Sequence, residues 1–320
     1  MRTVRSCLVC FLVLIAISSA SLNAQSAKSS KPKESLKQSN TTASFILVGA
    51  GDIAGCEDLS GARATAALIE NIPGTVFATG DLAYNSGSIW EFRNCYDPTW
   101  GKFKDRTKPA PGNHEYNGSS AIGYFQYWGN QAGDPKKGYY SYDLGAWHVV
   151  VLNTNCEILS LGGCGEGSPE EKWLREDLAS HANSCIAAYG HYALFSSGIF
   201  PRHGRHAELK PLWRALYAAH ADLILAGHEH SYERFAPQDP DGRLDAEHGI
   251  RQITVGTGGR SHTLLGFAQP NSEVRNDDTY GVVELTLSPG RYKWEFVPES
   301  GRNFRDSGEG TCHNVSPIAK

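Results

Sequence analysis

Five short apolar runs punctuate the chain, and each ends in a glycine followed at once by a polar side chain that can bind a metal ion. Four of the runs have the β-branched or small apolar character of buried strands, whereas the third is short and contains proline. The runs are residues 45–52 (FILVGAGD), 75–81 (TVFATGD), 108–114 (KPAPGNH), 185–191 (CIAAYGH) and 223–230 (LILAGHEH).

Stretches of helical character lie between these runs, at residues 60–72, 168–182 and 206–221. Ser168 and Glu171 form a capping pair for the second stretch, with proline at the first helical position. Strands that alternate with helices predict parallel β-α-β units, which bind ligands beyond the carboxyl ends of their strands. We therefore expect the five runs to deliver their polar residues to one edge of a sheet.

The other apolar segments resemble the strands of hairpins and suggest a second sheet packed on the first. The predicted fold is α/β, with two packed mixed β-sheets flanked by helices. The segments are residues 138–144, 147–154, 251–258, 280–288 and 292–298.

The N-terminal segment has a different composition. Two arginines precede an apolar stretch from Cys7 to Ile17, and small residues follow it, which is the layout of a secretory signal peptide. The next residues are rich in Ser, Lys and Thr, as disordered leaders are. No later apolar run is long enough to span a membrane. We predict a signal peptide at 1–24, a disordered polar leader at 25–43 and one domain at 44–320, with the mature protein secreted or periplasmic.

The charge argues against one class of function, and the cysteine content indicates disulfides. Residues 1–43 carry six Lys or Arg and one Glu, so the net charge of −4 becomes −9 for the remainder, which gives no reason to expect nucleic-acid binding. Six cysteines follow the signal peptide, and an even number in an exported chain indicates disulfides, with metal binding through thiolates as the alternative. Several connectivities are open, and we favour Cys56 with Cys95, Cys156 with Cys164, and Cys185 with Cys312.

The polar residues at the strand ends carry the chemistry. Singly they are weak signals, because an isolated buried histidine is more often a core residue than a ligand. Carboxylates, an amide oxygen and imidazoles without thiolates suit iron, manganese or zinc, and their number predicts two ions with a bridging carboxylate. Such a pair stabilises the attacking and leaving oxygens of a displacement at phosphorus, which indicates phosphate ester hydrolysis. The residues are Asp52, Asp81, Asn113, His114, His191, His228 and His230.

These motifs resemble a known family in order and kind. GD, GDLAY, GNHE, the strand-end histidine and GHEHSYER are similar to the motifs of the calcineurin-like metallophosphoesterases. Tyr84 and the SYER segment resemble the purple acid phosphatase branch. The resemblance extends from about Ser44 to Arg234, and it implies that residues 44–320 form a dinuclear metallophosphoesterase catalytic domain.

The resemblance also implies a role for each residue. A first metal ion, Fe³⁺ in the family, would bind Asp52, Asp81, Tyr84 and His230. A second, divalent ion (Fe²⁺, Zn²⁺ or Mn²⁺) would bind Asp81, Asn113, His191 and His228. His114 would donate a proton to the leaving alkoxide or stabilise the phosphoryl group, and the nucleophile would be a metal-activated hydroxide. A purely structural Tyr84 is the alternative to a phenolate ligand.

Other residues are secondary candidates. Asn113 and two histidines of IFPRHGRH, His203 and His206, are predicted substrate contacts, although His206 can instead open the next helix. In TVGTGGRSH we favour a tight turn over a phosphate contact by Arg260 or His262. Glu115 and Tyr232 are expected to support the site from behind its ligands.

The sequence therefore predicts an exported phosphatase that acts on small phosphomonoesters and binds neither nucleic acid nor membranes. A phosphodiesterase or nucleotide pyrophosphatase with the same metal ligands is the first alternative. A non-catalytic phosphate-binding protein is the second, and the retention of His114 argues against it, because holding metal does not require that residue.

Overall fold

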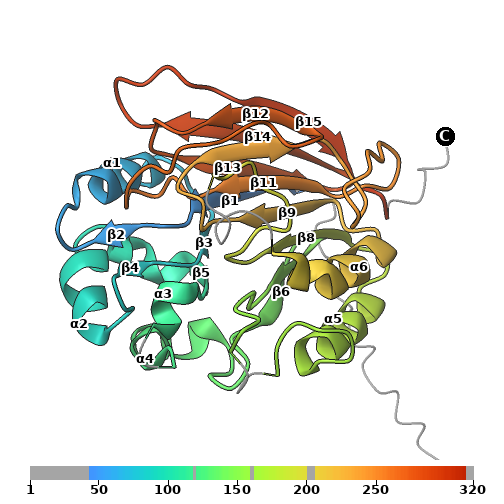
Figure 1. Ribbon diagram of the computed structural model, residues 1–320, viewed down its shortest axis with the longest axis horizontal. Helices are drawn as coiled ribbons and strands as arrows, with labels where there is room; N and C mark the ends of the chain where they lie inside the picture. The colour runs from blue at the N-terminus through green and yellow to red at the C-terminus, as the bar shows by residue number, and fades with distance from the viewer. Residues whose placement is uncertain (1–42, 118–119, 159–161, 200–205, 315–320) are drawn as a thin grey trace, which may run out of the picture. The chain divides into compact units, whose positions relative to one another are not determined.

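The structure, a computed structural model, describes residues 43–117, 120–158, 162–199 and 206–314. The predicted signal peptide, nearly all of the predicted leader and His203 lie outside the described residues. Two β-sheets face each other (Figure 1). In order, the first sheet contains β15 (Ser307–Thr311), β14 (Arg291–Pro298), β13 (Gly281–Ser288), β1 (Phe45–Ala50), β3 (Thr75–Thr79) and β5 (Thr107–Ala110).

The second sheet holds the middle of the chain and is also mixed. A further pair of very short strands, β2 (Ala54–Gly55) and β4 (Ala83–Tyr84), lies beside the two sheets. In order, the second sheet contains β12 (Ser272–Asn276), β10 (Tyr232–Phe235), β11 (Arg251–Val255), β9 (Leu223–Ala226), β8 (Cys185–Tyr189), β7 (Trp147–Val151) and β6 (Tyr140–Leu144).

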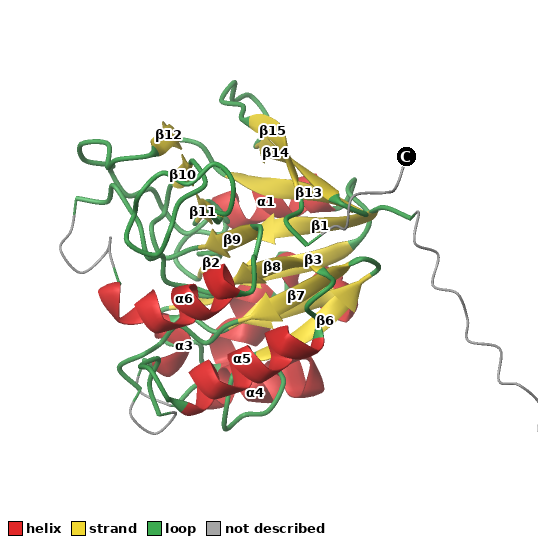
Figure 2. Ribbon diagram, turned by 90° about the vertical axis from the view of Figure 1, so that its right-hand side faces the viewer, coloured by secondary structure: helices red, strands yellow, loops and turns green. Residues whose placement is uncertain are grey.

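The apolar core lies between the sheets and under the helices. Phe77 on β3 and Tyr189 on β8 have ring centroids 5.8 Å apart, and Tyr232 on β10 is 4.8 Å from Phe296 on β14. Helices α5 (Pro169–Ser180) and α6 (Lys210–Ala218) cover the outer face of the second sheet (Figure 2). Helix α1 (Ser60–Ile69) packs on the first sheet, and α2 (Ile89–Glu91), α3 (Asn113–Tyr116) and α4 (Ile122–Trp128) follow β4 and β5.

This architecture confirms the predicted fold class, but it corrects the expected placement of the strands. The five glycine-ended runs do not share one sheet: β1, β3 and β5 belong to the first, and β8 and β9 belong to the second. Their ends still meet, because the backbone joins the two sheets there. Gly51 N–H donates to Val255 O across the sheets at 2.9 Å, and within the second sheet Gly227 N–H, after β9, donates to His191 O, after β8, at 2.9 Å.

Three disulfides join Cys56 to Cys95, Cys156 to Cys164 and Cys185 to Cys312, which is the predicted pairing. The last of them ties the end of the described chain to the start of β8. No helix within the described ranges has the length and apolar content needed to cross a bilayer.

An ionic cluster around the buried His148 side chain fastens α5 to the hairpin of β6 and β7. The His148 side chain is only 1% exposed, with Nδ1 2.8 Å from Asp143 Oδ1 and Nε2 2.8 Å from Asp177 Oδ2. The His181 ring stacks on it at 3.6 Å. Burial opposes the charged imidazolium, but the hydrogen bonds to Asp177 and Asp143 outweigh it and raise the pKa of His148.

We expect His148→Gln to destabilise the protein by roughly 2 kcal/mol at pH 5, because it removes two charge-assisted hydrogen bonds. The pKa of His148 is higher in the folded than in the unfolded chain. Its stabilisation is therefore complete below the unfolded pKa of about 6.5 and is lost as pH rises through the raised folded value. Urea unfolding at pH 5 and at pH 9 measures this, and a penalty that does not shrink at pH 9 would contradict it.

Candidate metal centre

Three of the predicted ligands lie in turns with left-handed backbone. Asp52, Asp81 and His228 have φ angles of 60°, 51° and 68°. Residues with a Cβ atom rarely adopt this conformation, and each instance costs about 1–3 kcal/mol. Such strain persists where the surroundings hold it, and it gathers at functional sites. The sharp turns after β1, β3 and β9 bring these three side chains together.

Glycines allow the same turns to approach each other closely. Gly80 has a φ of +88°, and a Cβ atom placed on it would lie 2.6 Å from His191 Nδ1. A Cβ atom on Gly112 would lie 2.2 Å from Asp81 Oδ1. Any other residue at either position would therefore displace a candidate ligand.

Asp52, Tyr84 and His230 form a first group of donors with Asp81. Tyr84 Oη lies 2.9 Å from Asp52 Oδ1 and 3.2 Å from Asp81 Oδ2. The same oxygen is 3.1 Å from His230 Nε2, which is itself 3.3 Å from Asp52 Oδ1. The phenol oxygen of Tyr84 thus points into the group, where a ligand would be.

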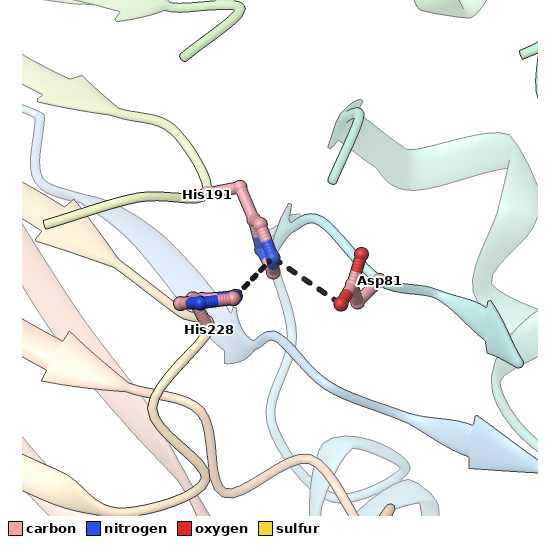
Figure 3. A group of neighbouring side chains, drawn as sticks. All are labelled: Asp81, His191 and His228. Carbon is pink, nitrogen blue, oxygen red and sulfur yellow. Dashed lines mark hydrogen bonds and ion pairs between the residues drawn. The ribbon is translucent and has the colours of Figure 1, made fainter. Parts of the chain in front are cut away.

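His191 lies at the centre of a second group of donors (Figure 3). Its Nε2 is 3.2 Å from Asp81 Oδ2 and 3.2 Å from His228 Nδ1. The same nitrogen is 2.9 Å from Asn113 Oδ1. Asp81 Oδ2 belongs to both groups, which is the position that a bridging ligand requires.

The spacing and chemistry of both groups suit metal ions. Donors about 2.1 Å from an ion lie roughly 3 Å apart in octahedral coordination. The separations above run from 2.9 to 3.3 Å. His191 Nδ1 bonds Thr79 O at 2.8 Å, and His230 Nδ1 bonds Ser261 Oγ at 2.7 Å. Such bonds hold the ring so that the other nitrogen faces a metal, so the side chains fit a dinuclear site.

Without metal ions, protons on the neighbouring side chains balance the negative charge of the buried carboxylates. Burial opposes ionisation of Asp81, but His191 outweighs it and holds the pKa of Asp81 well below its usual range. Burial opposes charging of His191 in turn, and Asp81 overcomes it and raises the pKa of His191 to about 9. Burial and the carboxylates of Asp52 and Asp81 hold the pKa of Tyr84 far above its usual value. Metal cations reverse this order, since they favour a phenolate and neutral imidazoles.

His114 faces the centre but belongs to neither group. Its backbone N–H donates to Asp81 Oδ1 at 2.8 Å, and its ring lies 4.4 Å from the Tyr84 ring. Nδ1 is 2.7 Å from the carbonyl oxygen of Asn85, which can only accept, so Nδ1 carries a proton. Nε2 lies 3.8 Å from Asp81 Oδ2, and 28% of the side chain is exposed. The ring can therefore meet a substrate without holding a metal.

The two residues expected to support the site differ. Glu115 is fully buried and accepts hydrogen bonds from backbone N–H groups of both motif loops, including those of Asp81 and Gly112. Burial and the Asp81 carboxylate raise the pKa of Glu115 to about 7. Tyr232 instead donates to Asp306 Oδ2 at 2.6 Å, so it joins β10 to the start of β15 and its expected role was wrong.

His206 approaches the second group through an intervening tyrosine. Its ring stacks on Tyr192 at 3.9 Å, and the Tyr192 ring is 4.5 Å from that of His228. His206 Nδ1 bonds Glu208 Oε1 at 2.8 Å, at the start of the short helix that leads into α6. His206 thus precedes that short helix, as its alternative interpretation expected, and its contact with substrate stays a prediction. Its ring is 5.7 Å from that of His228.

The loop after β11 contains Arg260 and His262, for which the sequence favoured a tight turn over a phosphate contact. Arg260 N–H donates to Asp52 O at 2.9 Å, and its guanidinium lies 4.9 Å from the centre of the Tyr84 ring. His262 stacks on Tyr280 instead, at 4.1 Å. The favoured interpretation as a simple turn was incomplete, because the loop also places Arg260 beside the first donor group.

A sequence profile described as calcineurin-like phosphoesterase matches residues 47–232, a range that contains every predicted metal ligand. The chain belongs to this family. Among curated relatives, the phosphoesterase chain is 25% identical over 244 residues to probable purple acid phosphatase 20 of Arabidopsis thaliana, covering 68% of this chain and 53% of that protein. It is 28% identical over 250 residues to acid phosphatase type 7 of Homo sapiens, covering 68% and 56%. The chain thus spans about half the length of these relatives, and it belongs to the purple acid phosphatase branch, which implies a dinuclear metal site.

Solved structures show the same fold. Purple acid phosphatase PPD1 from yellow lupin seeds matches with a TM-score of 0.66 at 18% identity, over 87% of this phosphoesterase and 57% of that chain. GAP50, described as the anchor in the inner membrane complex of Plasmodium, matches with a TM-score of 0.65 at 16% identity, over 84% and 89%.

Proposed function

We propose that the protein is an exported dinuclear-metal phosphatase that hydrolyses phosphomonoesters. The observation that carries this proposal is one oxygen, Asp81 Oδ2, which lies 3.2 Å from Tyr84 Oη in one donor group and 3.2 Å from His191 Nε2 in the other. Two cations that share a carboxylate can stabilise the attacking and leaving oxygens of a displacement at phosphorus. Relatives described as acid phosphatases support the same class of reaction.

The side chains around the centre have separate roles in this proposal. His114 is the general acid in this proposal. The Asn85 carbonyl keeps one proton on Nδ1, so a second proton on the ring lies on Nε2, where it can be donated to the leaving alkoxide. Asn113 orients the phosphoryl group from the start of α3. The carboxylates of Asp52 and Asp81 are almost completely buried, which keeps bulk water from screening the charges.

We assign Fe³⁺ to the group with Tyr84 and a divalent ion, Fe²⁺, Zn²⁺ or Mn²⁺, to the group with His191. Phenolate and carboxylate oxygens suit a hard trivalent ion, whereas imidazoles suit the divalent ones. When bound, the ions supply an activated water and neutralise charge on the phosphoryl group. Two carboxylates and one phenolate leave such a pair with net positive charge, which attracts a phosphate ester.

The test is metal analysis and a visible spectrum of the purified protein, followed by turnover of an aryl phosphate and a bis-aryl phosphate. We expect iron with a second metal, a phenolate-to-iron absorption, and faster hydrolysis of the monoester. A clear preference for the diester would favour the phosphodiesterase alternative. A protein that binds phosphate with its metals but hydrolyses neither ester from acidic to alkaline pH would be a binding protein.

Tyr84→Phe tests the iron assignment separately. We expect this variant to lose the visible absorption and to keep its fold, because the change removes a single oxygen from a residue that is 2% exposed. The measurement is the visible spectrum together with the far-ultraviolet circular dichroism. If colour is present in the wild type and survives in the variant, Tyr84 is not the chromophoric ligand.

Export rests on the N-terminal sequence and on the three disulfides, which form in oxidising compartments. N-terminal sequencing of the exported protein is expected to start after Ala20 or Ala24. Recovery of active protein that still carries its N-terminal apolar stretch would contradict cleavage.

A further inference from the structure

We propose that Arg260 binds the phosphoryl group and makes the site selective for phosphomonoester dianions over phosphodiesters. This inference rests on the proposed function, since it names the substrate class of the same metal centre. It concerns a cation that no metal-binding motif contains, and it begins from the place of Arg260 in the fold.

The backbone holds Arg260 against the first donor group. Its N–H donates to Asp52 O at 2.9 Å, and the next residue, Ser261, bonds His230 Nδ1 at 2.7 Å. The side chain packs against the backbone of Gly55, where an added Cβ atom would lie 2.7 Å from Nη1. Arg260 is therefore next in sequence to a residue that bonds a predicted metal ligand. Its guanidinium packs over Gly55 of β2.

The guanidinium lies over the ring whose oxygen enters the centre. Its carbon is 4.9 Å from the centroid of the Tyr84 ring, and His114 contacts the same ring at 4.4 Å. Asn85 links the two side chains, because its carbonyl bonds His114 Nδ1 and its Oδ1 accepts from Arg260 Nη2 at 3.3 Å. His114 and Arg260 thus both contact the ring whose oxygen enters the centre, and Asn85 bonds to both of them.

Arg260 has donors to offer. Glu57 pairs with Nη1 and Asn85 accepts from Nη2, which leaves three of the five guanidinium N–H groups without a partner among the described residues. The Glu57 side chain is 53% exposed and that of Arg260 is 20% exposed. An ion pair with an exposed carboxylate is screened by water, whereas a guanidinium binds phosphate through two parallel hydrogen bonds. A phosphate can therefore replace Glu57.

Charge then decides the substrate class. A phosphomonoester carries a second negative charge above a pKa of about 6, whereas a diester carries one charge throughout. A permanent cation beside the metal pair favours the dianion, and the second ester group of a diester would meet Arg260 without that charge. The phosphomonoester dianion is thus the ligand that the arginine recognises.

The experiment compares Arg260→Gln with wild type in the metal-loaded protein. We expect the KM for an aryl phosphate at pH 7.5 to rise roughly 10-fold or more, since a charged bidentate contact is lost. The kcat/KM for a bis-aryl phosphate should change less than about 3-fold. At pH 5, where the monoester is a monoanion, the effect on the aryl phosphate should shrink. Equal losses for both esters, or a loss that does not depend on pH, would show that Arg260 only packs on Tyr84.

Calorimetric titration with inorganic phosphate tests the same contact without turnover. The variant should bind phosphate roughly 10-fold or more weakly at equal metal content, and unchanged affinity would overturn the proposal. If the wild type hydrolyses neither ester, the proposed function fails, but this titration still decides the role of Arg260.

Two control variants separate charge from structure. Arg275→Gln removes the same charge from the exposed strand β12 and should leave phosphate affinity unchanged. Glu57→Gln removes the competitor for the guanidinium and should leave phosphate affinity equal or tighter. If Glu57→Gln weakens phosphate binding as much as Arg260→Gln does, the ion pair is a structural unit and the proposal is wrong.

Discussion

Asp81→Asn is expected to lower kcat for an aryl phosphate by roughly 10³-fold or more, because it removes the one negative charge that both donor groups share. Asp81 Oδ2 lies 3.2 Å from Tyr84 Oη and 3.2 Å from His191 Nε2, so this one oxygen contacts both groups. An amide keeps the shape of the carboxylate but binds cations weakly. Metal content should therefore fall below two ions per chain, and it is measured by mass spectrometry of the dialysed protein.

The matched control is Asp105→Asn, which makes the same change at an exposed position. It should keep full metal content and activity. Melting of the metal-free proteins shows whether Asp81→Asn still folds, since the variant also breaks the ion pair with His191. A folded Asp81→Asn protein with two metal ions and near-normal turnover would remove the bridging role.

His114→Ala is expected to lower kcat by roughly 10²- to 10⁴-fold without loss of metal, because the residue supplies a proton and binds no ion. Its ring is held by the Asn85 carbonyl and lies beside the Tyr84 ring, outside both donor groups. Metal content and the visible spectrum should match the wild type. Turnover is measured with an aryl phosphate and an alkyl phosphate at the same pH.

The two substrates identify what His114 does. A phenolate leaves readily without a proton, whereas an alkoxide does not, so the alkyl ester should suffer the larger loss if His114 is a general acid. Equal losses for both esters would mean that His114 stabilises the phosphoryl group instead. An unchanged kcat would exclude both roles.

Local patterns predicted most of the elements. Apolar runs that end in glycine became β1, β3, β5, β8 and β9, and the capped stretch at residues 168–182 became α5, with Ser168 Oγ accepting from the Glu171 N–H. The disulfide pairing was also predicted. The strand and helix patterns depend on neighbouring residues, which the sequence contains directly, whereas the pairing was chosen from several open connectivities and one bond spans 127 residues.

Sheet membership could not be read in the same way. A glycine-ended run has the same pattern in either sheet, and whether β8 joins β3 or β7 depends on crossovers and on packing between distant segments. The polar residues after the five apolar runs still lie together, because the turns after β1 and β11 are bonded to each other across the sheets. The ligands meet through that contact.

The environment of the centre was the least predictable part. Ser261 and Thr79 orient two histidines through contacts that span 31 and 112 residues of sequence, and neither belongs to a recognisable motif. The sequence favours a simple turn over a phosphate contact by Arg260, because two glycines precede this residue. Only the fold shows that this turn lies against Asp52. Long-range contacts of this kind leave no local signal in a single sequence.

The left-handed backbone at Asp52, Asp81 and His228 has an evolutionary consequence. Glycine fits that conformation without strain, so at these positions it would relieve strain in the fold while removing a metal donor. Selection for activity and selection for stability thus oppose each other at the same three residues. In a descendant lineage that no longer needs catalysis, we expect glycine to appear at these positions early, before the surrounding core changes.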